Sequence, residues 1–221
     1  MATLSLGVFA SGRGSNFASI LEAIRDRRLD ASVRLLVSNN PEAGALATAG
    51  ANGIPARVIA SRDFASRETF IQTLLSALRE HGVEFIALAG YMKRIPDEIV
   101  RAYRNRVCNI HPALLPSFGG KGMYGRRVHE AVLEQGCKVT GVTVHLVDEE
   151  YDHGPIVAQR AVPVEEGDTA ESLAERVLRI EHRLYPEVLQ LFSEGRVDVV
   201  GRRAVVREGG RSPDCSTSNA R

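Results

Sequence analysis

An amide and an imidazole stand two residues apart, at Asn109 and His111, and a carboxylate follows further along the chain at Asp152. The first pair lies in a short apolar run typical of a β-strand, where side chains two apart point to the same side. Asp152 lies in residues 151–155 (YDHGP), whose Gly and Pro predict a loop. If this loop reaches the strand, the three side chains can polarise a carbonyl, move a proton and orient the imidazole. This set of groups predicts acyl transfer.

Each of these residues also has a purely structural interpretation. His111 could be a hydrogen-bonded core residue where a strand ends at Pro112, and Asp152 could serve only as a turn residue. Cys108 raises the question of a nucleophilic thiol, but on a strand it would point opposite to Asn109, into the core, where free cysteine is common. Spacing alone does not prove that Asp152 meets His111, so their partnership is a hypothesis.

A glycine turn at residues 11–16 (SGRGSN) stands between a predicted strand and a predicted helix. Such a turn presents free backbone N–H groups and the positive helix end, which together bind anions, and Ser15 and Asn16 add side-chain donors. The dinucleotide fingerprint is incomplete, because Phe17 stands where its third glycine belongs and the next strand ends in residues 38–40 (SNN) without an acid. We therefore expect a phosphate site here, with a capped tight turn as the structural alternative.

Two further loops are candidates for ligand contacts. Residues 90–96 follow a buried strand at the edge of the sheet where α/β proteins collect ligands, and Tyr91, Met92 and Ile95 could line a slot for a flat ring. An aromatic plug in an ordinary loop is the alternative. Residues 119–125 contain four glycines, which disfavours rigidity, so this loop is either a mobile lid or a plain surface loop.

The hydrophobic periodicity predicts the elements that position these residues. Predicted strands are residues 4–10, 33–38, 56–59, 83–89, 107–110, 138–147 and 156–164, and predicted helices are residues 17–24, 43–52, 66–81, 96–103, 126–135 and 169–192. Their alternation predicts an α/β fold with three layers: a mostly parallel, Rossmann-like sheet with helices on both faces. The last two of these strands, joined by the Asp152 loop, predict a mixed or antiparallel C-terminal part, and residues 197–207 a final edge hairpin.

Composition and charge set the class of protein. The 221 residues are 44% hydrophobic and 25% charged with a net charge of +1, as in ordinary globular proteins without a field for nucleic acid or anionic membranes. The three cysteines form no Cys-x-x-Cys pair, and we expect a cytoplasmic protein with no membrane or nucleic-acid partner. No metal is predicted, because no metal-ligand spacing of His and Cys occurs. We expect one domain over residues 1–207 and a disordered tail over 208–221.

Four segments resemble the formyltransferases that use 10-formyltetrahydrofolate. Residues 109–116 (NIHPALLP) and 141–155 (GVTVHLVDEEYDHGP) are similar to their two signatures. Residues 11–16 and 88–92 (LAGYM) narrow the resemblance to the members that act on glycinamide ribonucleotide in purine synthesis. The likeness runs from about residue 5 to about residue 207, and the combination is more specific than any one segment.

The resemblance implies a reaction and a set of roles. The amino group of glycinamide ribonucleotide attacks the formyl carbon of 10-formyltetrahydrofolate, giving formylglycinamide ribonucleotide and tetrahydrofolate. His111 would handle the proton, Asn109 would donate a hydrogen bond to the developing oxyanion, and Asp152 would hold His111 and favour its charged form. Carried over by position, the ribonucleotide residues are Gly14, Ser15, Asn16 and Glu181, with residues 178–180 beside them, and the folate residues are Arg67, Met92, Lys93, Arg94, Ile95 and Asn109.

The resemblance also assigns the phosphate and ribonucleotide to residues 1–105 and the catalytic groups and folate to residues 106–207. Two departures stand out. Lys93 and Arg94 occupy positions where one basic and one apolar residue are expected, and residues 119–125 are glycine-rich where some members carry histidines. No role is therefore carried over to that loop, and the separate roles of the two basic residues stay open. The resemblance leaves a monomer or a homodimer equally possible.

Rival interpretations make different predictions. Methionyl-tRNA formyltransferase would add a C-terminal nucleic-acid-binding domain, and formyltetrahydrofolate hydrolase an N-terminal regulatory domain; we expect neither here. A nucleotide-dependent dehydrogenase would bind NADH and ignore folate, and the missing third glycine disfavours it. A binding module that has lost its chemistry would bind ligand without turnover, which the presence of Asn109, His111 and Asp152 disfavours.

Overall fold

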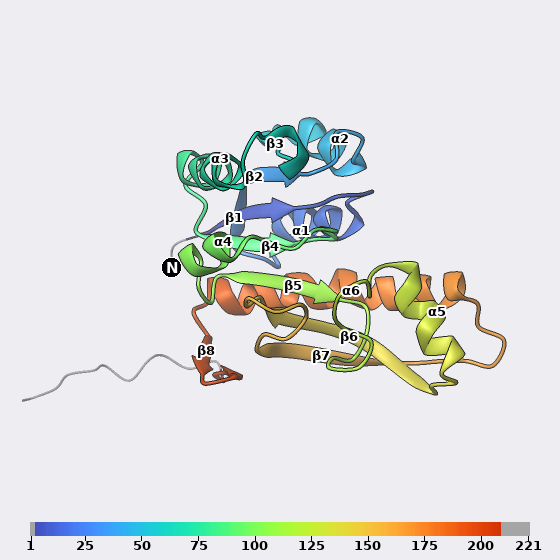
Figure 1. Cartoon of the computed structure of the whole chain (residues 1–221). Coiled ribbons are helices and arrows are strands. Elements are labelled where there is room, and N and C mark those ends of the chain that lie inside the picture. Colours follow the sequence, from blue (N-terminus) through green and yellow to red (C-terminus); the bar gives the residue numbers. More distant parts are fainter. Residues whose placement is uncertain (1–2, 209–221) are drawn as a thin grey trace, which may run out of the picture.

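The computed structural model describes residues 3–208, which form a seven-stranded sheet with helices on both faces (Figure 1). The sheet contains β1 (Leu4–Phe9), β2 (Ala31–Ser38), β3 (Ala56–Val58), β4 (Phe85–Leu88), β5 (Val107–His111), β6 (Val139–Leu146) and β7 (Ile156–Pro163). The helices are α1 (Ser15–Arg25), α2 (Gly44–Ala51), α3 (Arg67–Glu80), α4 (Asp97–Ala102), α5 (Arg126–Glu134) and α6 (Ala170–Ser193), with a 3-10 turn at Ser61–Asp63. The predicted α/β class and three layers are confirmed. The predicted tail covers residues 208–221, and residues 209–221 lie outside the described part of the chain.

The strand order is β3-β2-β1-β4-β5-β6-β7, and the direction of pairing changes at β5. Strands β1 to β5 pair in parallel, whereas β5 with β6 and β6 with β7 pair antiparallel. The mixed C-terminal part is therefore as predicted. The chain winds outward in opposite directions from β1 and β4, so the loops that leave these two strands diverge and open a crevice at the carboxyl edge of the sheet.

Two hydrophobic clusters fill the spaces between the layers, one on each face of the sheet. Strands alternate their side chains between them, so that Cys108 and Ile110 pack in the cluster under α1, α5 and α6. Val107, on the opposite face of the same strand, joins the cluster under α3 and α4. Asn109 and His111 therefore point to the side of α3 and α4, as the two-residue spacing predicted. At their position along the strand, loops rather than these two helices cover the sheet.

The long helix α6 connects both halves of the sheet. Thr169 begins it with a capping box: its side chain accepts from the Ser172 N–H while the Ser172 hydroxyl accepts from the Thr169 N–H. The fully buried Tyr185 lies near its middle, with the hydroxyl 3.0 Å from the carbonyl oxygen of Leu88 and 3.1 Å from that of Cys108. Tyr185 therefore ties the ends of β4 and β5, the strands that lead into the predicted site, to one helix.

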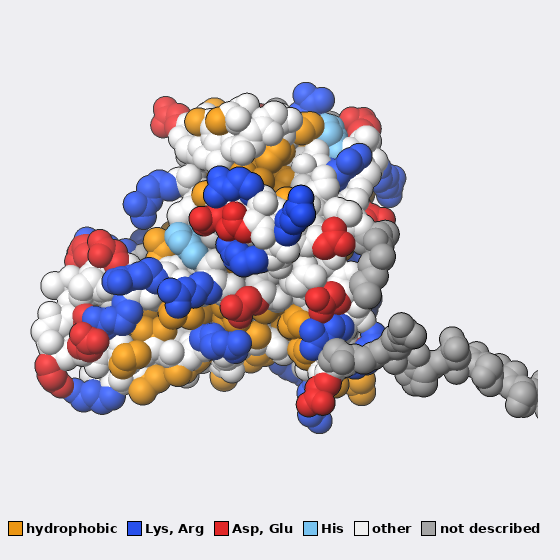
Figure 2. Space-filling view, turned by 180° about the vertical axis from the view of Figure 1, so that it is seen from behind, with side chains coloured by type: hydrophobic (Ala, Val, Ile, Leu, Met, Phe, Trp, Pro, Cys, Tyr) orange, Lys and Arg blue, Asp and Glu red, His pale blue; other side chains and the backbone are white. Residues whose placement is uncertain are grey.

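The C-terminal hairpin differs from its prediction. Strands β8 (Val197–Val200) and β9 (Arg203–Val206) pair only with each other and form a separate two-stranded sheet. The main sheet therefore ends at β7, and the hairpin lies beside it, at the lower left of Figure 1. Over residues 3–208, no helix combines the length and the apolar character that crossing a bilayer requires. Acidic and basic side chains are interspersed over the face drawn in Figure 2.

Replacing Tyr185 by Phe removes the only hydrogen that this side chain can donate to the two buried carbonyls. We expect Tyr185→Phe to lower the free energy of unfolding by about 1–3 kcal/mol, because a buried acceptor loses its donor. Chemical denaturation measures the difference. Tyr124→Phe, the same chemical change at a residue that is 46% exposed, is the control and should change stability little. Equal stability of the two variants would contradict this role of Tyr185.

Candidate active site

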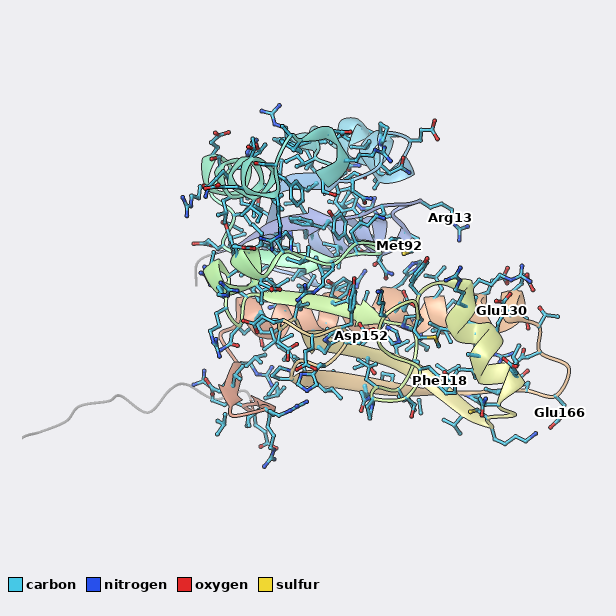
Figure 3. All side chains as sticks on the ribbon, in the orientation of Figure 1. Arg13, Met92, Phe118, Glu130, Asp152 and Glu166 are labelled. Carbon is cyan, nitrogen blue, oxygen red and sulfur yellow. The ribbon has the colours of Figure 1, made fainter. Side chains whose placement is uncertain are left out.

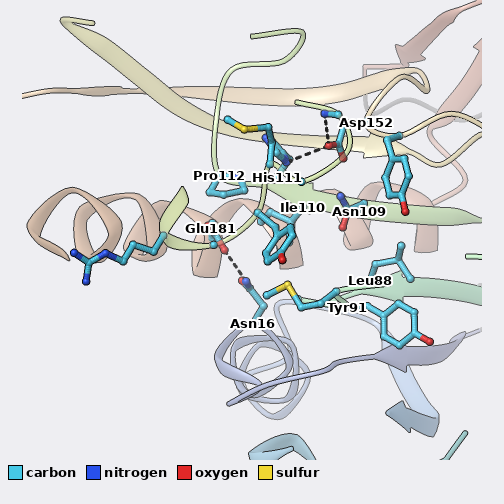
Figure 4. Close-up of a pocket in the computed structure, with 18 of the residues that line it drawn as sticks. Asn16, Leu88, Tyr91, Asn109, Ile110, His111, Pro112, Asp152 and Glu181 are labelled. Carbon is cyan, nitrogen blue, oxygen red and sulfur yellow. Dashed lines mark hydrogen bonds and ion pairs between the residues drawn. The ribbon is translucent and has the colours of Figure 1, made fainter. Parts of the chain in front are cut away.

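A cavity of about 660 Å³ lies at the carboxyl edge of the sheet and is lined from both halves of the chain (Figure 4). Nine of the predicted site residues line it: Asn16, Met92, Lys93, Arg94, Ile95, Asn109, His111, Asp152 and Glu181. Gly14, Ser15 and Arg67 are not among the described residues that form its wall. In Figure 3, Met92 and Asp152 lie on opposite sides of β5, so that the loops after β4 and β6 flank this strand.

His111 is almost completely buried and has a partner at each ring nitrogen. Its Nε2 lies 2.8 Å from the carbonyl oxygen of Phe118, so Nε2 carries the proton and donates it there. Its Nδ1 faces Asp152 Oδ2 at 3.7 Å. Burial lowers the pKa of His111, and this outweighs the nearby carboxylate and the carbonyl, which raise it. The ring is therefore neutral at neutral pH, with the lone pair of Nδ1 toward Asp152. Asp152 favours the charged form of His111, as the resemblance implied, but desolvation is the larger effect.

Asp152 is held as an ionised acceptor. Its backbone is left-handed (φ 53°), a conformation that Asp tolerates better than most residues, and its Oδ2 accepts the Gly120 N–H at 2.9 Å. Burial raises the pKa of this carboxyl, but the imidazoles of His145 and His111 and the Gly120 N–H lower it by more, so the net pKa is below the usual range. A fixed negative charge therefore stands beside the neutral imidazole of His111.

His145 is a site residue that the sequence analysis did not find. It lies directly across from Asn109 in the antiparallel register of β5 and β6. Its Nδ1 donates to the Leu146 carbonyl at 2.9 Å, so in the neutral ring Nε2 accepts from Asn109 Nδ2 at 3.2 Å. One amide hydrogen of Asn109 is thereby fixed, and the second is free for a ligand in the cavity. His145 Nε2 also lies 3.6 Å from Asp152 Oδ1, so this ring contacts two site residues.

The glycine turn forms the N-terminus of α1. Gly14 has φ 80°, and a Cβ there would lie 2.7 Å from the Cβ of Ala45, so this position requires glycine both for its backbone and for the approach of α2. The first helical bond is from the Ala18 N–H to the Gly14 oxygen at 2.8 Å. The amides of residues 15–17 therefore have no partner within the helix, as an anion site at a helix end requires.

Asn16 and Glu181 meet across the cavity wall from α1 and α6. Asn16 Nδ2 donates to Glu181 Oε2 at 2.6 Å, and both side chains are buried. Burial raises the pKa of Glu181, and the Asn16 bond opposes this only in part. Asn16 Oδ1 is buried and has no hydrogen-bond partner among residues 3–208. The Asn16 side chain thus leaves an acceptor free, which suits a hydroxyl or N–H group of a ligand and does not suit a phosphate.

The loop after β4 forms another part of the wall. Ser11 links it to the glycine turn, because the Met92 N–H donates to Ser11 Oγ at 2.8 Å and the Ser11 N–H donates to the Gly90 oxygen at 3.0 Å. Met92 is 46% exposed on this wall, and Tyr91 packs edge-on against Phe9 with ring centroids 5.3 Å apart. The apolar slot that the sequence predicted is present.

The basic residues predicted for folate differ in their surroundings. Lys93 lines the cavity. Arg94 also lines it, but its guanidinium donates to Asp97 Oδ1 at 2.6 Å and to the carbonyl oxygen of Glu149. Arg67 is away from the cavity and forms a two-pronged pair with Glu98 at 2.6 and 2.9 Å.

The glycine-rich loop contributes Gly120, Gly122 and residues 123–126 to the wall. Gly120, Gly122 and Gly125 all have positive φ, which explains the glycines without requiring motion. Movement of this loop stays a prediction. Over residues 3–208, the structure contains no cluster of three or more His, Cys, Asp and Glu side chains placed to hold a metal ion.

The cysteine prediction is confirmed. Cys108 is fully buried on the face opposite to Asn109, and burial raises the pKa of its thiol to about 12. A thiol with this pKa carries almost no thiolate at neutral pH and cannot serve as a nucleophile.

With this geometry in place, comparison with known proteins identifies the family. Residues 5–189 match the family described as formyl transferase. The chain belongs to the formyl transferase family. The match includes the strand with Asn109 and His111, the Asp152 loop and Glu181, and it ends before the C-terminal hairpin.

Two curated members of the formyl transferase family are strongly similar. The chain is 50% identical over 194 residues to the chloroplastic phosphoribosylglycinamide formyltransferase of Arabidopsis thaliana, covering 87% of this chain and 66% of the plant protein. It is 42% identical over 183 residues to the phosphoribosylglycinamide formyltransferase of Bacillus subtilis, covering 83% of this chain and 91% of that protein. The crystal structure of glycinamide ribonucleotide transformylase 1 from Symbiobacterium toebii matches with a TM-score of 0.88 and 40% identity, covering 94% and 95% of the two chains. The expected formyltransferase fold is thereby confirmed.

The balance between burial and charge at His111 can be measured directly. We expect the His111 imidazole to titrate below its ordinary range, and Asp152→Asn to shift the midpoint further down, because it removes the attraction that favours the charged ring. Nitrogen-15 NMR of the imidazole, assigned with His111→Ala, follows this titration. Glu150→Gln removes one charge from the same loop and is the control. A midpoint that rises in Asp152→Asn would show that the carboxylate does not act on this ring.

Proposed function

We propose that this chain transfers the formyl group of 10-formyltetrahydrofolate to the amino group of glycinamide ribonucleotide, giving formylglycinamide ribonucleotide and tetrahydrofolate. One observation carries the proposal. A single cavity joins the buried set Asn109, His111 and Asp152 to Asn16 in the first turn of α1 and the buried carboxylate of Glu181 on one side. On another side it reaches the apolar side chains of Met92 and Ile95. Two substrates, one with a phosphate and one with a flat ring, can therefore meet at the imidazole.

The ribonucleotide would bind between α1 and α6. Its phosphate would accept from the free amides of residues 15–17, where the helix dipole also favours negative charge. Glu181 and Asn16 Oδ1 are acceptors placed for the ribose hydroxyls or the amide N–H groups of the substrate. This arrangement gives Gly14 and Ser15 a role through their backbone.

The folate would lie with its ring system along the loop after β4. Met92 and Ile95 supply apolar contacts, and Lys93 supplies a positive charge for a carboxylate of the donor. Arg94, committed to Asp97 and the Glu149 carbonyl, would act by holding this loop against the Asp152 loop. Arg67, paired with Glu98, would contact the folate only outside the cavity.

The chemical step follows from the protonation states. The unprotonated amine attacks the formyl carbon, and the carbonyl oxygen becomes an oxyanion that accepts the free hydrogen of Asn109 Nδ2. The attacking nitrogen loses a proton to the neutral His111, and the ionised Asp152 stabilises the imidazolium formed. When the carbon–nitrogen bond to the folate breaks, that proton passes to the departing nitrogen. A positioned oxyanion donor typically contributes about 10²–10³-fold to the rate, and a positioned proton carrier about 10²–10⁴-fold.

The remaining expectations belong to the same proposal. Residues 1–105 would supply most of the ribonucleotide site and residues 106–207 the catalytic groups, with Glu181 reaching back across the cavity to Asn16. The chain would work in the cytoplasm, as a monomer or homodimer, without a metal or a nucleic-acid partner.

The first test is a spectrophotometric assay with glycinamide ribonucleotide and a 10-formylated folate or its deaza analogue. We expect release of deformylated folate that depends on the ribonucleotide and falls by orders of magnitude in His111→Ala and Asp152→Asn, with little change in ribonucleotide affinity for the latter. Release without ribonucleotide would instead indicate a hydrolase. If no deformylated folate is released, with or without glycinamide ribonucleotide, the proposal is overturned.

A second test separates binding from chemistry at the ribonucleotide end. Asn16→Ala removes the donor to Glu181 and the free acceptor, so KM for the ribonucleotide should rise by about tenfold or more, while kcat changes less. Asn52→Ala, at the exposed end of α2, is a matched control that should keep the wild-type KM. An unchanged KM in Asn16→Ala would place the ribonucleotide elsewhere in the cavity.

A further inference from the structure

The loop that carries Asp152 is stabilised internally by one carboxylate. Asp148 accepts the Glu150 N–H at 2.9 Å through Oδ1 and faces His153 Nδ1 at 2.7 Å through Oδ2. These bonds join the first and last residues of the segment 148–153. They also determine the His153 tautomer: Nδ1 donates to Asp148, so in the neutral ring Nε2 is left as an acceptor.

The end of this segment is held by the C-terminal hairpin. Arg202, in the turn between β8 and β9, donates from Nη2 to the His153 carbonyl oxygen at 3.1 Å and from Nη1 to the His153 Nε2. Both acceptors belong to the residue directly after Asp152. A planar guanidinium that bonds two acceptors on one residue fixes that residue's orientation better than a single bond does.

The other end of the segment is held by a second arginine. Arg94 bonds the Glu149 carbonyl oxygen and is itself fixed by Asp97. The segment is thus tied to the loop after β4 at its start and to the hairpin at its end, with the left-handed Asp152 between the two ties. After it, Gly154 lies against the Leu146 carbonyl with no room for a side chain.

We propose that Arg202 is a positioning residue for the catalytic carboxylate: through His153 it sets the distance between Asp152 and His111. The inference rests on the proposed function, since it concerns the same site. It extends the functional unit to the hairpin, which lies beyond residues 5–189, the part that matches the family. A further cavity of about 570 Å³ is lined by the hairpin turn and by Leu115 and Gly119, and both Arg202 and His153 lie on its wall.

The matched variants are Arg202→Ala and Arg203→Ala. The two arginines are neighbours on the same exposed turn and carry the same charge, but the structure records hydrogen bonds to the loop 148–153 for Arg202 alone among the described hairpin residues. We expect Arg202→Ala to lower kcat by about three- to tenfold, as misplacement of a catalytic group does, with KM for both substrates within about twofold of wild type. Arg203→Ala should have the kcat and KM of the wild-type protein, and both variants should have the wild-type melting temperature.

A double-variant cycle tests the route through His153. If Arg202 acts on the loop through this residue, Arg202→Ala combined with His153→Ala should lower kcat by less than the product of the two single effects, because the imidazole is one of the two His153 groups that Arg202 bonds. Multiplicative effects on kcat would show that the two residues act separately and would overturn the proposed route.

A measurement without substrate tests the inference even if the proposed function is wrong. In Arg202→Ala, the His111 imidazole should titrate at lower pH than in wild type and in Arg203→Ala, because the Asp152 carboxylate is held less closely to it. The same midpoint in all three proteins would overturn the inference whether or not the wild type transfers formyl groups. Absence of ribonucleotide-dependent transfer in wild type, with a lowered midpoint in Arg202→Ala, would overturn the proposed function and leave the positioning role supported.

Discussion

The alternation of side chains along β5 is the constraint on which the site depends. Cys108 and Ile110 are buried against α6, so Asn109 and His111 must emerge on the other face. That face is covered by α3 and α4 only over the first half of the sheet. The helix that follows β5, α5, packs in the cluster that contains Cys108 and Ile110, and loops close over the two polar side chains on the other face. A one-residue shift in register would place both in the core and the thiol in the cavity.

At His111, burial lowers the pKa and the charge of Asp152 raises it. Burial has the larger effect, so the resting imidazole is neutral. The site is dry enough that His111 is neutral, yet it contains an ionised carboxylate whose N–H and imidazole partners offset its own desolvation. A neutral base beside a fixed anion is poised to accept a proton and to stabilise the charge that results. The same pair in a more open site would rest as an ion pair and would have no basic nitrogen to offer.

Sequence reasoning found most of the site because most of it follows local rules. Asn109 and His111 could be placed by strand periodicity, and the glycine turn by its position between strand and helix. His145 could not be placed in this way. Its contact with Asn109 depends on the register between β5 and β6, which the local sequence pattern does not determine. The role of Arg94 depends on a carbonyl 55 residues away, and the hairpin was misplaced because an alternating run does not reveal its partner strand.

The arrangement of Asn16 and Glu181 refines what kind of site a glycine turn makes. A helix N-terminus alone attracts an anion, and a side-chain amide there would be expected to help. Here that amide donates to a buried carboxylate, so its donor is used, and its buried oxygen has no partner among the described residues. On the proposed function, the carboxylate of Glu181 and the positive N-terminus of α1 would act on different groups of one ligand. The amides would bind the phosphate, and the Asn16–Glu181 pair would bind hydrogen-bond donors of the sugar or the amide. Such a site would favour a phosphorylated sugar over free phosphate, because only the larger ligand would satisfy the buried acceptors as well as the amides.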